Sequence, residues 1–150
     1  MMEDLSQRSL SVTRMFNAPI NLLWQVLTTA DYIKDWWGPD GFTNTIRIME
    51  VSEGGKWEFT MHGPDGTDYE NVFIYREIVP LKKIVMDHLA DPKFTISIRL
   101  FDEGEQTRME WQNTFETVAD FKLAVDTFKA DEGLKQNIER LAAYINTLTQ

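Results

Sequence analysis

Alternation of apolar and polar residues with a period of two dominates the middle of the chain, from residue 44 to residue 116. In its clearest run, Trp57, Phe59 and Met61 share one face and polar residues separate them, which is typical of a half-buried strand. Turn residues such as Gly63–Gly66 interrupt the alternation. Because strands joined by short turns pair as antiparallel hairpins, this stretch predicts an antiparallel sheet.

Helix signals flank the alternating stretch and do not interleave with it. A first strand over Ser9–Phe16 is followed by a short helix over residues 19–28, which begins at Pro19. A second short helix carries Trp36 and Trp37 and ends at Gly38. The remaining strands are predicted over residues 44–51, 57–62, 69–79, 83–89, 94–101 and 107–115.

The end of the chain predicts two helical segments. Thr117 and Asp120 have the spacing of a capping box and open a segment that reaches Phe128. Residues 131–148 then carry an apolar stripe at helical spacing, formed by Leu134, Ile138, Leu141, Ile145 and Leu148. Together these elements predict an α+β fold, in which a curved antiparallel sheet of six to seven strands wraps around a long C-terminal helix.

Composition restricts the partners and the chemistry. The chain has 150 residues, which suits a single domain over residues 1–150, with residues 1–7 expected to form a flexible N-terminus. Its net charge is −9 with no cluster of Lys or Arg, so we expect no nucleic-acid partner and no membrane insertion. There is no cysteine, and no metal site or cofactor is expected. The lack of a secretory signal favours a cytoplasmic location.

Three motifs resemble a known family. They are Asp35–Phe42 (DWWGPDGF), Gly54–Gly66 (GGKWEFTMHGPDG) and Tyr75–Pro80 (YREIVP). In this order, over roughly residues 8–148, they resemble the stand-alone homologues of the activator of the heat shock protein 90 ATPase. These proteins belong to the START-like or SRPBCC superfamily, also called the Bet v-like or polyketide cyclase-like group. The resemblance implies a helix-grip fold with an apolar cavity between the sheet and the last helix.

Superfamily members include lipid carriers, hormone receptors, cyclases and chaperone activators, so the resemblance implies lipid binding or a role in the stress response without choosing between them. Two departures from the family pattern matter. Leu134 follows Gly133 where the family often has tryptophan, which is expected to enlarge the cavity. The chain also lacks the separate amino-terminal domain with which the eukaryotic activators engage their partner.

Aromatic and methionine side chains on the inner faces are the candidate ligand-binding residues, because they offer area and adaptable contact to apolar ligands. A cavity of roughly 300–1,000 Å³ is ordinary for such a site. One or two polar groups, His88, Tyr75 or Tyr144, would orient the ligand. The candidates are Trp36, Trp57, Phe59, Met61, Phe73, Tyr75, Met86, His88, Met109, Trp111, Phe128, Leu134, Ile138 and Leu141.

Helix geometry predicts different positions for the two adjacent tryptophans. Neighbouring helical residues point about 100° apart, which predicts that only one of Trp36 and Trp37 faces the core. The other would stand at the cavity entrance, where it could equally serve a homodimer interface. The glycine-containing loop over residues 38–43 could then move as a lid. His62 is expected to point outward, away from Trp57 and its neighbours.

Two further functions remain open beside the binding of a small apolar ligand. The resemblance suggests a chaperone partner, namely a heat shock protein 90 whose ATPase the chain would bind or stimulate. Alternatively, His88 could act as acid or base in a cyclase or hydrolase. No nucleophile triad, phosphate-binding loop or paired-carboxylate motif is present, so the sequence favours a binding protein over an enzyme and assigns no catalytic residue.

Overall fold

A seven-stranded antiparallel sheet forms the frame of the computed structural model, which describes residues 5–90 and 92–149. The strand order is β1-β7-β6-β5-β4-β3-β2, and every neighbouring pair is antiparallel. The strands are β1 (Ser9–Phe16), β2 (Thr43–Met49), β3 (Lys56–His62), β4 (Asp68–Val79), β5 (Lys83–His88), β6 (Phe94–Glu103) and β7 (Gln106–Phe115).

Helices occupy the positions that the sequence predicts. Two short helices follow β1, and a third short helix and the long terminal one follow β7, in the order α1 (Ile20–Thr28), α2 (Ala30–Trp36), α3 (Val118–Asp126) and α4 (Ala130–Leu148). The Thr117 hydroxyl accepts a hydrogen bond from the Asp120 N–H at 3.0 Å, as the capping motif predicts. Residues 1–4 of the expected flexible N-terminus lie outside the described residues, and Leu5–Arg8 form one turn of 3₁₀-helix.

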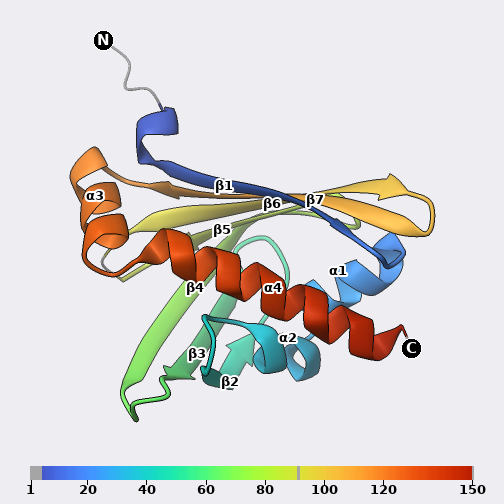
Figure 1. The fold of residues 1–150 in the computed structure, drawn as a ribbon, viewed down its shortest axis with the longest axis horizontal. Coiled ribbons are helices and arrows are strands. Elements are labelled where there is room, and N and C mark those ends of the chain that lie inside the picture. Colours follow the sequence, from blue (N-terminus) through green and yellow to red (C-terminus); the bar gives the residue numbers. More distant parts are fainter. Residues whose placement is uncertain (1–4, 91, 150) are drawn as a thin grey trace.

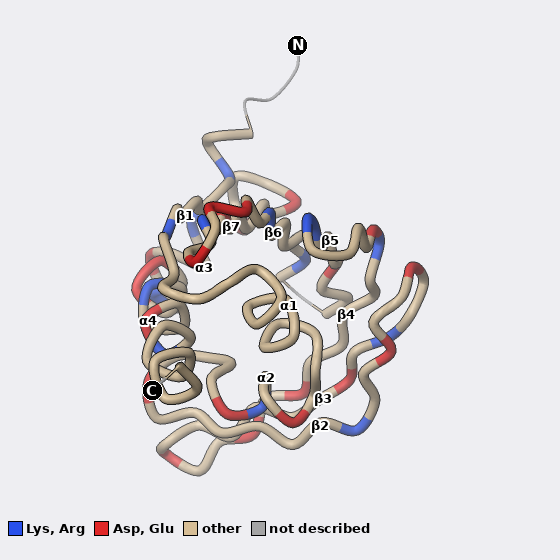
Figure 2. The backbone as a smooth tube through the Cα atoms, turned by 90° about the vertical axis from the view of Figure 1, so that its right-hand side faces the viewer, with Lys and Arg blue, Asp and Glu red and all other residues tan. Residues whose placement is uncertain are grey.

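The sheet curves around α4, which crosses its concave face (Figure 1). Viewed along α4, the strands form an arc with β1 and β2 at its two ends, while α4 closes the open side (Figure 2). The uncharged helix α1 lies inside this arc (Figure 2). Register shifts at Ile46/Ile48 and at Tyr75/Glu77 mark irregularities in β2 and β4, and such irregularities increase local bending. The predicted α+β helix-grip fold is confirmed.

One hydrophobic core fills the space between the concave face and the helices. Its sheet half consists of the alternate residues that point inward, and its helix half combines the buried residues of α1 and α2 with the apolar stripe of α4. Leu134, Ile138, Leu141 and Ile145 on this stripe are all buried. α4 closes the open side of the arc and α1 lies inside it (Figure 2), so the space between the sheet and α4 is one part of the concave side.

Candidate functional site

Aromatic side chains fill most of the space between the sheet and α4. The Trp37 ring lies in the middle, with its centroid 4.7 Å from that of Trp57 and 5.6 Å from that of Trp111. Trp57 stacks on Phe59 and Phe73, with centroids 4.2 and 5.4 Å away. All five side chains are buried. The protein itself therefore occupies this part of the predicted cavity.

The placement of Trp37 corrects the sequence-based prediction. Only one of the two adjacent tryptophans was expected in the core, yet Trp36 and Trp37 are 0% and 6% exposed. The physical reason is that α2 ends at Trp36, and Trp37 has an extended backbone (φ −68°, ψ 135°), so the helical angle between neighbours does not apply. With both rings buried, neither supplies the exposed indole on which the expected dimer interface rested.

A pocket of about 210 Å³ remains at the end of this space where α4 begins. Its walls are the inner face of the sheet, the loop after α2 and the junction between α3 and α4. Ala130 and Gly133 leave room on the helix side because their side chains are small. The pocket is smaller than the roughly 300–1,000 Å³ that is usual for ligand sites, because Trp37 and its neighbours take up the rest of the space.

Five of the predicted ligand-binding residues line this pocket: Met61, Phe73, Trp111, Phe128 and Leu134. Phe128 is 67% exposed, which places it at the mouth of the pocket. The other predicted residues are buried in the surrounding core and do not line the pocket, namely Trp36, Trp57, Phe59, Tyr75, Met86, His88, Met109, Ile138 and Leu141. A ligand-binding role for all of them stays a prediction.

His88 is buried beside the pocket and bonded to the protein on both sides of its ring. Nδ1 lies 2.9 Å from the Ala90 carbonyl oxygen and 3.2 Å from that of Pro92, and Nε2 lies 2.9 Å from Oδ1 of Asn71. The ring also stacks on Phe94, at a centroid distance of 4.7 Å. Burial lowers the pKa of His88, while the contacts with the two carbonyl groups oppose this effect.

The two tyrosines proposed as polar contacts also lie away from the pocket. Tyr75 is 3% exposed in the core, and burial raises its pKa. Tyr144 packs against Tyr32 on α2, with ring centroids 6.3 Å apart. Neither side chain lines the pocket, so the polar groups that could orient a ligand there are others.

Three asparagines supply the polar groups of the pocket wall, and sequence reasoning missed them. Asn71 is on β4, Asn113 on β7 and Asn137 on α4, and all three line the pocket. Asn137 is only 7% exposed. A signal for them exists, because each is a polar residue at a position that the alternation or the helical stripe assigns to the inner face.

The loop after α2 is fastened to α4 by Arg140, which sequence reasoning also missed. Its guanidinium donates hydrogen bonds of 2.9–3.2 Å to five backbone carbonyl groups, those of Asp35, Trp37, Gly38, Pro39 and Phe42. Residue 140 lies next to the apolar stripe of α4, and this position alone does not predict these hydrogen bonds. The loop that the sequence suggested as a lid is thus held against α4.

Gly38 closes the loop against the pocket. Its N–H donates to Oδ1 of Asn137 at 3.0 Å, and its φ of +98° lies in the region that favours glycine. A Cβ atom at this position would be 2.8 Å from Cε of Met61. The backbone angle therefore favours glycine here, and the close approach adds to this preference only as far as the flexible end of Met61 does not move aside.

Metal chemistry and membrane spanning find no support in the described part of the chain. Within residues 5–90 and 92–149, no group of three or more His, Cys, Asp or Glu side chains could hold a metal ion. Over the same residues, no helix has both the length and the apolar character needed to cross a bilayer.

A family model confirms the family that the three motifs resemble. The model described as "Activator of Hsp90 ATPase homolog 1-like protein" matches residues 17–146. The chain belongs to this family. The matched range includes the whole wall of the pocket, from the loop after α2 to α4. No curated protein matches the chain.

Solved structures similar to this member of the Activator of Hsp90 ATPase homolog 1-like family support the fold. A protein from Arthrobacter aurescens is 23% identical with a TM-score of 0.89, covering 97% of this chain and 90% of its own. A protein from Nitrosomonas europaea is 22% identical with a TM-score of 0.86, covering 96% and 97%. An AHSA1-like protein from Aeromonas hydrophila is 13% identical with a TM-score of 0.76, covering 94% of both chains. At these identities the likeness concerns the fold alone.

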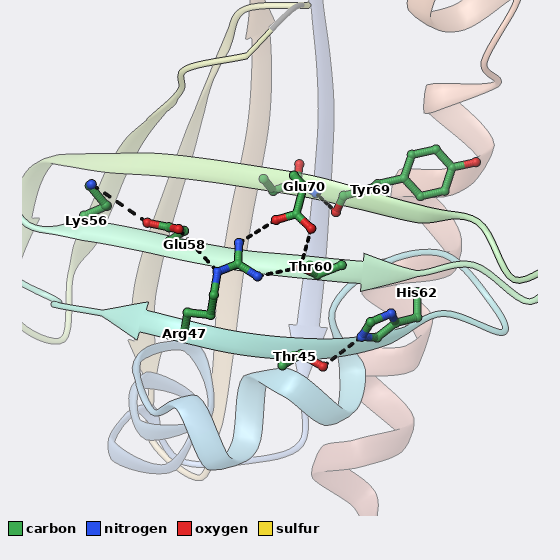
Figure 3. A network of polar contacts seen from close by, with 9 residues as sticks. Thr45, Arg47, Lys56, Glu58, Thr60, His62, Tyr69 and Glu70 are labelled. Carbon is green, nitrogen blue, oxygen red and sulfur yellow. Dashed lines mark hydrogen bonds and ion pairs between the residues drawn. The ribbon is translucent and has the colours of Figure 1, made fainter.

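The outer face of the sheet in this family member carries a polar network away from the pocket (Figure 3). Arg47 on β2 donates hydrogen bonds to Glu58 and Thr60 on β3 and to Glu70 on β4, at 3.3, 2.6 and 2.6 Å. His62 points outward here, as predicted, and lies 2.8 Å from the Thr45 hydroxyl. These contacts join the three strands of one end of the sheet, on the face opposite the aromatic core.

Proposed function

We propose that this chain binds a small apolar or aromatic ligand in the pocket between the sheet and the start of α4. The observation that carries the proposal is a 210 Å³ pocket whose wall combines Trp37, Phe73, Trp111 and Leu134 with a few amide groups. An apolar lining with few polar groups is the usual composition of small-molecule sites. Binding would be driven by removing the ligand's apolar surface from water, at about 25 cal/mol per Å².

The pocket size limits the ligand to one small ring system. An apolar cavity of about 150 Å³ is enough to take up benzene, and this pocket measures about 210 Å³. Long lipid chains exceed this volume unless the aromatic core opens. Neutral single-ring and fused-ring probes such as toluene and indole are therefore suitable test ligands.

The test uses nuclear magnetic resonance of the tryptophan indole N–H groups during titration with neutral indole or toluene. Saturable shifts are expected for Trp37 and Trp111, which line the pocket, and smaller ones for Trp36, which does not. L134W should abolish the shifts by filling the pocket. L148W, a matched change at an exposed position of the same helix, should leave them intact. Absence of any saturable shift in the unmodified protein would rule the proposal out.

Family membership favours a second candidate, which is binding to a heat shock protein 90 and stimulation of its ATPase. The support is the family model over residues 17–146, whose description names such an activator. The measurement is the ATPase rate of a heat shock protein 90 with and without a saturating amount of this chain. An unchanged rate would eliminate this candidate, and an L134W variant would show whether any stimulation depends on the pocket.

A cyclase or hydrolase reaction at His88 gains no support from the geometry. Its Nδ1 faces two backbone carbonyl groups and its Nε2 faces Asn71. A general base must reach the proton that it abstracts. His88 lines a separate pocket of about 520 Å³ and not the pocket beside α4, and both of its ring nitrogens already face protein oxygen atoms. Of the three functions left open by the sequence, ligand binding is the one that the pocket supports best.

A further inference from the structure

The polar groups of the pocket are hydrogen-bond donors. Asn137 is 7% exposed, and its Oδ1 accepts the Gly38 N–H at 3.0 Å. This bond fixes the orientation of the amide, because an N–H group needs an oxygen acceptor. Within the described residues, Nδ2 of Asn137 donates to no partner and is not enclosed by protein. A buried amide with an open donor therefore lines the pocket.

Asn113, on the sheet side of the pocket, shows the same arrangement. Its Oδ1 accepts the indole N–H of Trp111 at 2.8 Å, so its Nδ2 is likewise the group left to donate. The third amide, that of Asn71, is engaged with His88 and with the Tyr69 carbonyl group. The pocket thus offers two amide donors from opposite walls, and a ligand that satisfies them must carry a hydrogen-bond acceptor.

The charge at the pocket is positive, although the chain as a whole is strongly negative. Lys129 is the one charged residue among the described residues that line the pocket, and it forms no ion pair within residues 5–90 and 92–149. The chain carries a net charge of −9, yet none of the described residues that line this pocket carries a carboxylate. A cation and two donors around the same pocket favour an anionic acceptor.

The start of α4 adds to the positive character of this wall. Lys129 is the N-cap residue of α4, and its side chain caps none of the first N–H groups of this 19-residue helix. Ala130, its first residue, lines the pocket. Uncapped N–H groups and the positive end of the helix dipole favour an anion at this position. Asp131 and Glu132 belong to the first turn but do not line the pocket.

We propose that the pocket selects a small monocarboxylate with a single aromatic ring, whose ring lies against Trp37 and Trp111 and whose carboxylate lies between Lys129 and the amides of Asn113 and Asn137. This inference rests on the proposed ligand-binding function and names the chemical class of its ligand. The volume of about 210 Å³ accommodates a benzene-sized ring, which needs about 150 Å³, together with a short acidic side chain.

Isothermal titration calorimetry with a matched pair of probes tests the proposal. The pair is 3-phenylpropanoate and 3-phenylpropanamide, which share their shape and differ in charge. The acid is expected to bind roughly tenfold tighter, since a charge-assisted contact contributes about 1.5 kcal/mol or more and each 1.4 kcal/mol is a factor of ten. In K129Q the difference between the two dissociation constants should become smaller, because the amide probe loses nothing when the charge is removed and the acid keeps only the two asparagine donors.

Two controls separate the outcomes. K122Q removes an exposed lysine of α3 that does not line the pocket, and it should preserve the preference for the acid. Equal affinities in the unmodified protein, or a preference of unchanged size in K129Q, would overturn the inference while the ligand-binding proposal stands. If neither the matched pair nor neutral indole binds, the ligand-binding proposal fails together with the inference.

Discussion

The two ends of the space between the sheet and α4 are built from the same elements but packed differently. At one end, Trp57, Phe59 and the ring of Trp37 fill the space with aromatic contacts. At the other end, where α4 begins, Ala130 and Gly133 face the amides of the sheet and a pocket of about 210 Å³ remains. This difference shows that the helix-grip fold does not by itself create a cavity. Side-chain size at a few inward positions decides where the frame is hollow.

If the aromatic end is purely structural, shortening Trp57 should have the largest effect on stability. W57A is expected to lower the free energy of unfolding by about 3–5 kcal/mol, because a buried tryptophan leaves a cavity that its neighbours cannot fill. Urea denaturation measures the loss. W24A, at a partly buried tryptophan on α1, should cost clearly less. A small effect of W57A would mean that the aromatic end tolerates open space and is not fundamentally different from the pocket.

Arg140 joins the two ends, because it holds the loop that carries Trp37 and Gly38. R140M is expected to reduce the free energy of unfolding by about 2–3 kcal/mol, the scale of hydrogen bonds to a charged group, and to speed hydrogen exchange of the amides in residues 38–42. R14M removes an exposed ion pair between Arg14 on β1 and Glu139 on α4. It should lower the free energy of unfolding by about 0–1 kcal/mol. Unchanged exchange in R140M would show that the loop is held by other contacts.

Substitution of Gly38 tests how tightly the loop closes the pocket. G38A places a methyl group 2.8 Å from Cε of Met61 at a φ of +98°, whereas G66A adds one at a φ of +89° with no atom within 4 Å. Both should lose about 1–2 kcal/mol through backbone strain, and G38A should lose more in urea denaturation because of the contact. Equal losses would indicate that Met61 can move aside, which would make the pocket adaptable.

The smallest expected effect concerns His88, which lies beside the pocket. Burial lowers its pKa below the ordinary value of 6.5, so the unfolded chain binds the proton more tightly than the folded protein. Its contribution to stability is therefore full above pH 6.5 and is lost as the pH falls through the lowered pKa. Urea midpoints at several pH values should show a weaker acid-side decline for H88Q than for the unmodified protein. An equal decline in H88Q and in the unmodified protein would contradict this assignment.

The sequence determined the fold because its signals are local and repeated. Alternation over residues 44–116 and the stripe of α4 recur at each element, so small errors at single residues do not change the architecture. The three motifs predicted the family, and the match over residues 17–146 confirms it. The small residue Gly133, followed by Leu134 in place of the family's frequent tryptophan, already pointed to the part of α4 that lines the pocket.

Tertiary structure alone decided which inward residues line open space and which only pack. Trp37 entered the core because α2 stops one residue earlier, and its ring then lay in the middle of the space where the family resemblance had implied a cavity. Asn137 and Arg140 form hydrogen bonds with a loop about a hundred positions earlier in the chain, and these bonds define their roles. Periodicity assigns a residue to a face, but the volume left beside that face depends on side chains that arrive from distant segments, and no local pattern encodes their meeting.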